Sequence, residues 1–219
     1  MKTINILKLE YNKNKGYVEQ IISFQNVFSL LHKNKQNNNY AILFPEIKGN
    51  NLGNSILIYS DNLDFLKQFN RVYINNDFIP TYFADYDINN ADKYGYSYRI
   101  NVLKKTTQSY IKNLIKHNFK NAKTKIDAKI KEMYEKDMEI TDIVQKLKKE
   151  IKSKYPYFIY NSTSLYKKGI YNKTIFQIGT KIFDKNKVNK EINIDFKAFN
   201  NFGLIKHNFK NSNVLLPVI

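Results

Sequence analysis

The chain of 219 residues has no cysteine, few acidic residues and no long apolar run, and each shortage excludes a class of protein. Without cysteine, it can form neither disulfides nor thiolate metal sites, so zinc would have only histidine and carboxylate ligands. No apolar run is long enough to span a bilayer, and the N-terminal "MKTINILKLEYNKNKG" becomes polar too early for a secretory signal. We therefore expect a folded protein of the cytoplasm, with no membrane segment.

The sequence motifs of common metal and phosphate sites are also missing. No glycine-rich phosphate loop, HExxH helix or EF-hand loop occurs, and no acidic residues cluster with metal-ligand spacing. We expect no bound metal and no cofactor.

Basic residues dominate the charge of the chain. The 36 lysines and arginines outnumber 19 acidic residues, which gives a formal net charge of +17 and a sequence pI near 9.7. Such a surface binds polyphosphates because it displaces their counterions, so nucleic acid is the first partner to consider. An AT-rich genome that places lysine and asparagine on solvated faces is the alternative explanation. It accounts for the asparagines better than for the imbalance of charge.

The first hundred residues predict the order strand, helix, strand, strand, helix, strand. Residues 3–11, "TINILKLEY", alternate apolar and polar side chains as a half-buried strand does, and residues 18–33 have apolar side chains at helical spacing. Asp61 is a candidate N-cap for the second helix, predicted over 61–69. The other predicted strands cover 39–47, 54–60 and 71–77. This βαββαβ order is that of a ferredoxin-like sheet, an architecture of RNA-binding modules among many others.

The pattern changes after residues 85–95, a polar stretch that we take as a domain junction. Residues 96–105 predict a strand running into a helix that Thr106 or Thr107 could cap. The buried stripe of this helix is predicted to consist of Ile111, Leu114 and Ile115. Lysines recur on another face every three or four residues and predict a basic ridge, made of Lys112, Lys116, Lys120 and Lys123.

Helical sequence continues from this ridge, with a predicted break near Thr141, and stops before Pro156. Three further strands are predicted, at 157–166, 173–183 and 191–199.

Three histidines are the candidate proton-transfer groups. RNA can be cut without metal because its 2'-hydroxyl can attack the adjacent phosphate once a base removes the proton, and histidine is the natural base at neutral pH. His117 and His207 lie in two copies of the octapeptide "LIKHNFKN", beside lysines, and we expect solvated or phosphate-touching side chains. His32 lies at the end of the first predicted helix, on the border of its apolar stripe. Spacing alone favours a helix cap over catalysis as the role of His32.

Six stretches carry a family resemblance: "FSLLHKNK", "YAILFPEIKGNNLGNSILIYS", "DFIPTYFADYD", "YSYRINVLKK", "IYNSTSLY" and "FNNFGL". In this order, along most of the chain, they resemble the CRISPR-associated endoribonucleases of the type I-F subtype. The most telling are the histidine that ends the first helix, "FP" before a glycine-containing turn, and the paired serines of "NSTS".

The resemblance implies an enzyme that cuts precursor CRISPR transcripts without metal. It would cleave each repeat at the 3' base of its hairpin and leave a 2',3'-cyclic phosphate and a 5'-hydroxyl. It would then stay bound to the hairpin of the mature guide RNA, as a subunit of the type I-F surveillance complex. The family's catalytic histidine matches His32, as base on the 2'-hydroxyl or acid on the leaving oxygen. Its active-site serine matches Ser162, with Ser164 on the same strand face, although "NSTS" could be an ordinary polar strand end.

The resemblance also implies where RNA binds. The family's arginine-rich helix matches the segment around Lys112 and Lys116, but lysine is a point charge that cannot form a bidentate fork, so we expect more salt-sensitive binding. The base-reading linker matches Arg99 and Asn101, and Arg99 is the best candidate for a contact with guanine. The candidate RNA-binding residues are therefore Arg99, Asn101, Lys104, Lys105, Lys112, Lys116, Lys120 and Lys123.

One departure from the family concerns Phe202, which stands where the family has a tyrosine before the glycine of its "YGL" segment. A phenyl ring can keep the packing but cannot hydrogen-bond to the histidine or the substrate. We expect slower or differently oriented chemistry, unless the hydroxyl of Tyr160 or Tyr166 takes its place.

The expected fold is α+β, with two domains. Residues 1–95 would form a ferredoxin-like domain with the catalytic histidine, and residues 96–219 an RNA-recognition domain with the lysine-rich helix, the serine and a small β-sheet. The leading hypothesis is an endoribonuclease of CRISPR repeats. Two alternatives stay open: a non-cleaving subunit that binds the hairpin, favoured if Phe202 marks a decayed site, and a generic basic ferredoxin-like RNA-binding module.

Overall fold

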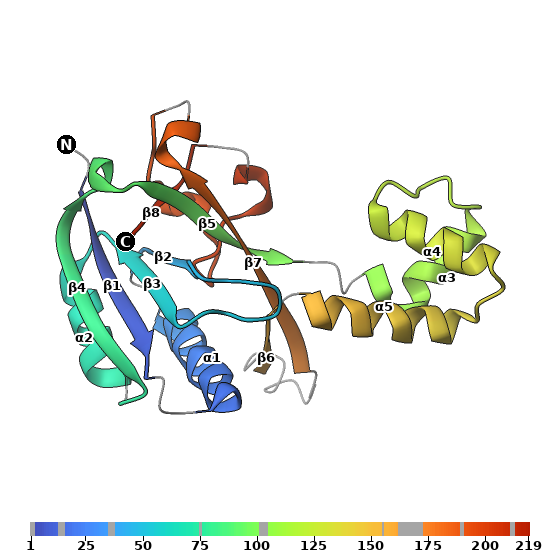
Figure 1. Ribbon diagram of the computed structural model, residues 1–219, viewed down its shortest axis with the longest axis horizontal. Coiled ribbons are helices and arrows are strands. Elements are labelled where there is room, and N and C mark those ends of the chain that lie inside the picture. The colour runs from blue at the N-terminus through green and yellow to red at the C-terminus, as the bar shows by residue number, and fades with distance from the viewer. Residues whose placement is uncertain are drawn as a thin grey trace.

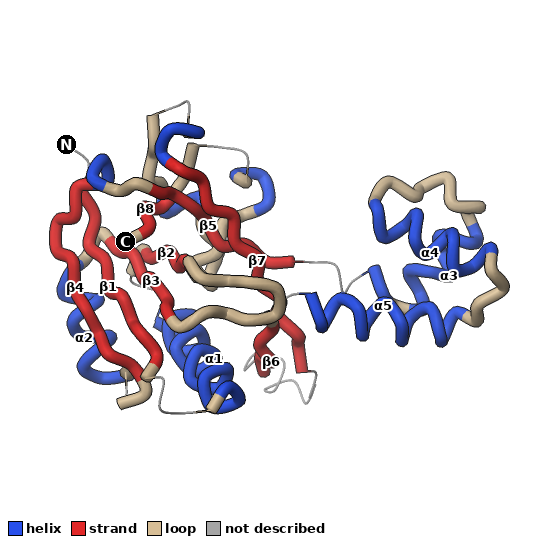
Figure 2. The backbone as a smooth tube through the Cα atoms, in the orientation of Figure 1, coloured by secondary structure: helices blue, strands red, loops and turns tan. Residues whose placement is uncertain are grey.

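A computed structural model describes residues 3–12, 16–34, 38–74, 76–100, 105–154, 156–161, 173–188, 191–210 and 213–219. For residues 17, 151–154, 157–161 and 173–176 it describes the backbone alone. Over these residues the fold is mixed α+β, with five α-helices and two antiparallel sheets (Figures 1 and 2). The expected α+β class is thus confirmed.

The first sheet has four strands in the order β2-β3-β1-β4. Its strands and the helices between them are β1 (Thr3–Tyr11), α1 (Tyr17–Asn34), β2 (Tyr40–Leu43), β3 (Ser55–Ser60), α2 (Leu63–Tyr73) and β4 (Phe78–Asp87). β1 pairs with both β3 and β4, so both of its edges are covered. Its side chains alternate between two cores: Leu7 and Leu9 pack with α1 and α2, and Ile4 and Ile6 pack on the opposite face.

Two details around α2 differ from the sequence prediction. Asn62, rather than Asp61, is the N-cap, because its side-chain oxygen accepts the Phe65 N–H at 3.0 Å. The predicted strand at 71–77 is wrong, since α2 continues through Tyr73 and the next strand begins at Phe78. Phe69 and Tyr73 are one helical turn apart, with ring centroids 5.5 Å apart. The apolar residues of this stretch therefore continue the spacing of the helix.

The second sheet comes from the C-terminal half of the chain, in the order β6-β7-β5-β8. Its strands are β5 (Lys93–Ile100), β6 (Tyr157–Asn161), β7 (Lys173–Asp184) and β8 (Leu216–Val218). Short 3-10 helices occupy Ile88–Asn90, Lys185–Lys187, Phe196–Ala198 and His207–Phe209.

The predicted strand at 191–199 is wrong. In this stretch Asn193 and Phe199 form only isolated bridges, with Val214 and Ile205, and a 3-10 helix lies between the two. The side chain of Asp195 accepts the N–H of Lys197, a local hydrogen bond that favours a turn over an extended strand.

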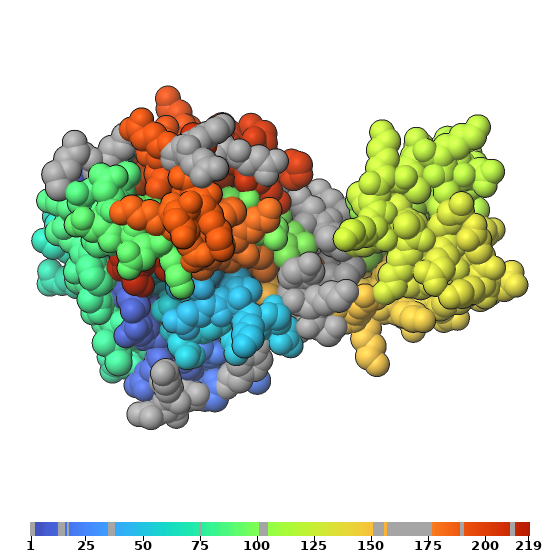
Figure 3. Space-filling view, turned by 45° about the horizontal axis from the view of Figure 1, so that its top comes forward, coloured from blue at the N-terminus to red at the C-terminus, as the bar shows by residue number. Residues whose placement is uncertain are grey.

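A helical lobe lies in the chain between β5 and β6, and it projects from the two sheets (Figures 1 and 3). Its helices are α3 (Gln108–Lys116), α4 (Lys125–Glu135) and α5 (Ile140–Lys154). Thr107 caps α3, as one of the two predicted caps. The helical sequence breaks just before Ile140, close to the predicted position. The lobe has its own core, made of Ile111, Leu114, Ile130, Met133, Ile143, Val144 and Leu147.

The first sheet separates two cores. One contains residues of α1 and α2, and the other contains residues of β5, β8 and the C-terminal segment. The predicted boundary between 1–95 and 96–219 falls inside β5, which pairs with β7 along its whole length. The division into two domains stays a prediction. None of the described helices combines the length and apolarity needed to cross a membrane.

Candidate functional site

His32 lies in the last turn of α1 and is partly buried. Its ring nitrogen Nδ1 lies 2.9 Å from the backbone carbonyl oxygen of Asn201, a residue 169 positions away. A carbonyl oxygen only accepts hydrogen bonds, so Nδ1 carries a proton and donates it. Nε2 is therefore the ring nitrogen that can accept a proton.

The carbonyl of Asn201 is held by a second donor. The hydroxyl of Tyr40, which is 1% exposed, donates to the same oxygen at 2.8 Å. The side-chain oxygen of the preceding Asn200 accepts the N–H of Phe202 at 2.8 Å, and this local hydrogen bond stabilises a turn at residues 200–203. His32 thus bonds to an oxygen whose position is fixed by buried structure.

Phe202 fixes the plane of the histidine ring. The two rings are stacked, with centroids 4.1 Å apart and planes inclined by 14°. Phe202 also stacks on Phe28, at 5.2 Å and 8°. Phe28 and His32 are four residues apart on α1 and therefore share one helix face. The aromatic stack and the hydrogen bond together define the orientation of the imidazole.

Gly203 allows the turn to lie against β2. Its φ is +70°, in the left-handed region that favours glycine. A Cβ at this position would lie 2.8 Å from the ring of Tyr40 and 2.9 Å from Ile42. The backbone N–H of Ile42 donates to the Gly203 carbonyl at 2.8 Å. Only a residue without a side chain fits this approach.

Sequence reasoning singled out His32 and Phe202, and the structure brings these two together. It missed Tyr40, Asn201 and Gly203, which hold them in place. The glycine after an asparagine pair in "NNFG" is a signal for a tight turn, but nothing in the sequence says which strand the turn contacts.

Four predicted site residues lie outside the described residues: Ser162, Ser164, Asn101 and Lys104. Tyr166 lies outside them as well, and Tyr160 belongs to β6, where the backbone alone is described. β6 ends at Asn161 and lies against α1, the helix that carries His32 (Figure 1).

The predicted lysine ridge is divided between a helix and a connection. Lys112 and Lys116 are exposed on α3, and Lys120 and Lys123 are exposed in the connection to α4. Residues 93–126 contain nine lysines and arginines and no acidic residue. The positive charge of this segment is therefore not balanced within the segment, and it favours polyanions as ligands.

Lys105 is paired inside the lobe. Its ammonium lies 3.3 Å from the carboxylate of Asp127, whose side chain is 1% exposed. Asp127 also accepts hydrogen bonds from the Tyr110 hydroxyl and from two backbone N–H groups, those of Lys123 and Thr124. Burial raises the pKa of this carboxyl, but the hydrogen bonds outweigh burial, and the pKa falls from 3.8 to about 2. Asp127, which sequence reasoning missed, thus ties α3 to α4.

Arg99 lies one residue before the end of β5, where the chain continues toward the helical lobe. It is partly buried, and burial lowers the pKa of its guanidinium. An arginine side chain in such a site keeps its charge at neutral pH.

The other two histidines are exposed and lie in different parts of the fold. His117 is the C-cap of α3, and His207 begins the 3-10 helix at His207–Phe209. Across the described part of the chain, no three histidine or acidic side chains are grouped so that they could hold a metal ion.

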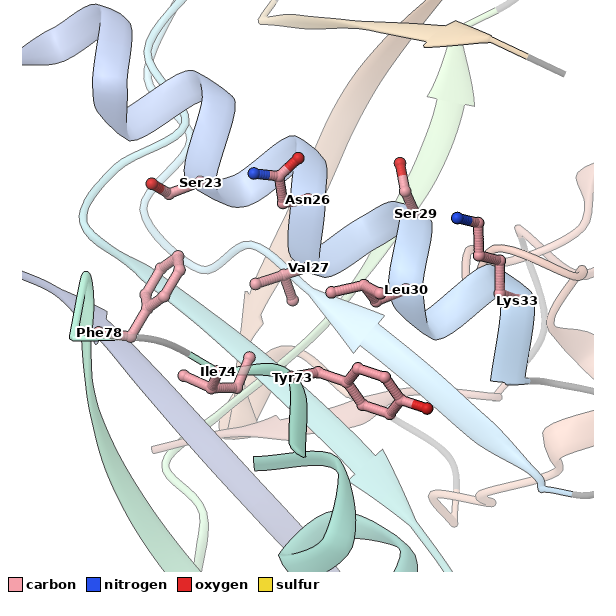
Figure 4. Close-up of a pocket in the computed structure, with 9 residues that line it drawn as sticks. All are labelled: Ser23, Asn26, Val27, Ser29, Leu30, Lys33, Tyr73, Ile74 and Phe78. Atoms are coloured by element: carbon pink, nitrogen blue, oxygen red, sulfur yellow. The ribbon is translucent and has the colours of Figure 1, made fainter. Parts of the chain in front are cut away.

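A cavity of about 330 Å³ lies between α1 and the end of α2 (Figure 4). Asn26, Leu30 and Lys33 line it from α1. At about 100° per residue, these side chains leave the helix roughly opposite to Phe28 and His32. The cavity is therefore separate from the histidine site.

Comparisons with known proteins give no relative: no protein-family model matches the chain, and neither does any curated protein.

Proposed function

We propose that the protein is a metal-independent CRISPR-associated endoribonuclease of the type I-F class, acting in the cytoplasm. It would cut repeat RNA at the 3' base of the hairpin and stay bound to the product within the surveillance complex. One observation carries the proposal: His32 and Phe202, drawn from two short stretches with the family resemblance, are stacked, with the histidine bonded to the turn that bears the phenylalanine.

In the proposed reaction His32 acts at Nε2, because its Nδ1 proton is engaged by Asn201. The neutral ring accepts the proton of the 2'-hydroxyl, and the 2'-oxygen attacks the adjacent phosphorus. The bond from phosphorus to the 5'-oxygen breaks, and that oxygen takes up a proton. The products are a 2',3'-cyclic phosphate and a 5'-hydroxyl. A ring fixed by stacking and by one hydrogen bond presents Nε2 in one direction, as a general base requires.

The remaining predicted residues would act around this base. Ser162 would orient the attacking ribose, and Ser164 and Tyr160 would support it. Arg99 and Asn101 would contact bases near the foot of the stem. The hairpin would lie against the basic part of the lobe, on Lys104, Lys112, Lys116, Lys120 and Lys123, with Lys105 acting mainly through its pair with Asp127.

Two features of the fold support this proposal. The elements of the first sheet follow one another as βαββαβ and the strands lie in the order β2-β3-β1-β4, which agrees with a ferredoxin-like domain. In the chain, the acid-free basic segment 93–126 runs from β5, which carries Arg99, into the helical lobe. Fold likeness alone does not define an activity, so the histidine site remains the main support.

A second candidate, a hairpin-binding subunit that does not cleave, is favoured by Phe202 itself. Its ring has no hydroxyl and lies flat on one face of His32. A side chain in this position can hold the imidazole but can give no hydrogen bond to substrate. Replacing Phe202 with tyrosine should raise the single-turnover rate if the missing hydroxyl limits the chemistry.

The deciding experiment is single-turnover cleavage of repeat RNA in EDTA. The unmodified RNA should be cut at the 3' foot of its hairpin, and RNA with a 2'-deoxy sugar at the scissile position should stay intact. His32→Ala should abolish cleavage and leave hairpin affinity unchanged. His207→Ala is the matched control, since it removes an exposed histidine elsewhere. Tight binding without cleavage by the unmutated protein would support the non-cleaving subunit instead.

A further inference from the structure

On the second sheet, the ring of Tyr98 forms an aromatic platform beside two lysines, Lys181 and Lys210. Tyr98 on β5 is paired with Gly179 on β7, and directly paired residues share one face of the sheet. A Cβ on Gly179 would lie 2.7 Å from the Tyr98 ring, so the ring rests on the bare backbone of the glycine. Tyr96 supports it from the same strand, with ring centroids 6.0 Å apart.

The ammonium of Lys210 is placed over this platform. It lies 4.1 Å from the centroid of the Tyr98 ring. The backbone carbonyl of Lys210 accepts the Tyr96 hydroxyl at 2.6 Å, which fixes the start of the side chain. The two tyrosines thus hold both ends of the lysine, and its charge is positioned before any ligand arrives.

Lys181 brings a second positive charge to the same place. It is paired with Tyr96 on the neighbouring strand and so lies on the same face of the sheet. Burial and the charge of Lys181 lower the pKa of the Lys210 ammonium. Within the described residues, no carboxylate forms an ion pair with Lys181 or Lys210. Two like charges held together without a counter-charge are relieved when an anion binds.

We propose that Lys181, Lys210 and the Tyr98 platform form a binding site for a phosphate group of a single-stranded RNA segment. Lysine ammoniums bind phosphate as point charges, and the Tyr98 ring, which rests on Gly179, holds the Lys210 ammonium in place. Lys210 lies eight residues after Phe202, and Ile205 between them forms a bridge with Tyr98, so the backbone links this site to the turn of the histidine site. That the phosphate belongs to RNA rests on the proposed function, whereas the phosphate chemistry of the site does not.

The test compares two double variants that remove equal charge. Lys181→Gln with Lys210→Met removes both ammoniums and keeps the aliphatic stem over Tyr98. The matched control, Lys67→Gln with Lys187→Met, removes two exposed lysines, one on α2 and one already paired with Asp184. Fluorescence anisotropy with labelled single-stranded oligouridylate gives the slope of log affinity against log salt.

The magnitude of this slope should fall by about 0.7 in the site variant, because one phosphate contact on a single strand contributes about 0.7. Between roughly 50 and 200 mM salt, its affinity should then fall about 2.6-fold less than that of the unmutated protein. The control should keep the original slope. Lys210→Arg keeps the charge and should also keep the slope, which separates a lost charge from a damaged fold.

Three outcomes would count against the inference or part of it. An unchanged slope in the site variant with no calorimetric binding of inorganic phosphate, or an equal change in the control, would overturn the site. Calorimetric binding of inorganic phosphate that depends on Lys181 and Lys210, together with an unchanged RNA slope, would overturn the assignment to RNA. Hairpin cleavage is measured separately, so its absence would reject the proposed nuclease while the slope still decides the phosphate site.

Discussion

Replacing Gly203 with alanine should damage both the fold and the histidine site. The backbone at Gly203 has φ +70°, where an alanine costs roughly 1–2 kcal/mol. The new Cβ would lie 2.8 Å from the Tyr40 ring and 2.9 Å from Ile42, and such overpacking costs typically about 1–3 kcal/mol. We expect the free energy of unfolding to fall by about 2–5 kcal/mol in total.

Gly49→Ala is a matched control for the backbone effect. Gly49 also has a left-handed backbone, with φ +61°, but a Cβ there would meet nothing within 4 Å. This variant should lose only the backbone contribution, roughly 1–2 kcal/mol. The difference between the two variants therefore measures the contact of the turn with β2.

Urea unfolding followed by circular dichroism gives both free energies. Nitrogen-15 NMR of the histidines supplies a second measurement, because it reports which ring nitrogen carries the proton. In the unmutated protein the neutral His32 should be protonated at Nδ1, and in Gly203→Ala this preference should weaken as the Asn201 carbonyl moves. The reasoning fails if Gly203→Ala is no more destabilising than Gly49→Ala, or if the His32 tautomer is unaffected.

Three further predictions concern the hydrogen bonds to the Asn201 carbonyl, the helical lobe and the basic ridge. Tyr40→Phe removes one of two donors to the Asn201 carbonyl and should cost about 1 kcal/mol in urea unfolding, with slower cleavage and unchanged hairpin affinity. The pKa of Asp127 is about 2 in the folded protein and higher in the unfolded chain. Its contribution to the free energy of unfolding, about 2 kcal/mol, is therefore complete above pH ~4 and is lost as the pH falls toward 2. Acid titration of helicity should show this loss, and Asp127→Asn should remove the pH dependence. Lys112→Gln with Lys116→Gln should lower the salt slope of hairpin binding by about 1.8, and an unchanged slope would exclude both lysines from the duplex contact.

The spacing of apolar residues within a strand or helix predicted those elements whose buried face follows that spacing. β1 alternates between two cores, and the apolar residues of α1 recur at helical spacing, so both elements could be predicted from the sequence. The strand over 78–87 could not, because it is an edge strand that is exposed along most of its length and lacks a clear alternation. The candidate site depends on a contact between Tyr40 and Asn201 across 161 positions, which no local pattern encodes.

The two copies of "LIKHNFKN" show how strongly distant partners decide local structure. In the first copy, Leu114 and Ile115 are consecutive on α3 and both pack on the core of the lobe, as a helix with about 100° between neighbours allows. In the second copy, Leu204 packs in the core with α1 and α2, whereas Ile205 packs in the other core. Neighbours that point to opposite cores require extended backbone, and Ile205 forms bridges with Tyr98 and Phe199.

The same comparison bears on the histidines. The octapeptide ends its helix at His117 in the first copy, and the following Asn118 and Phe119 take left-handed backbone with φ of 45° and 55°. In the second copy His207 begins a 3-10 helix instead. Identical neighbours thus give two exposed histidines in unrelated settings. His32 differs because the Asn201 carbonyl and the Phe202 ring, from a distant segment, fix its ring, and that tertiary contact, rather than the residues adjacent in the chain, makes it the candidate for chemistry.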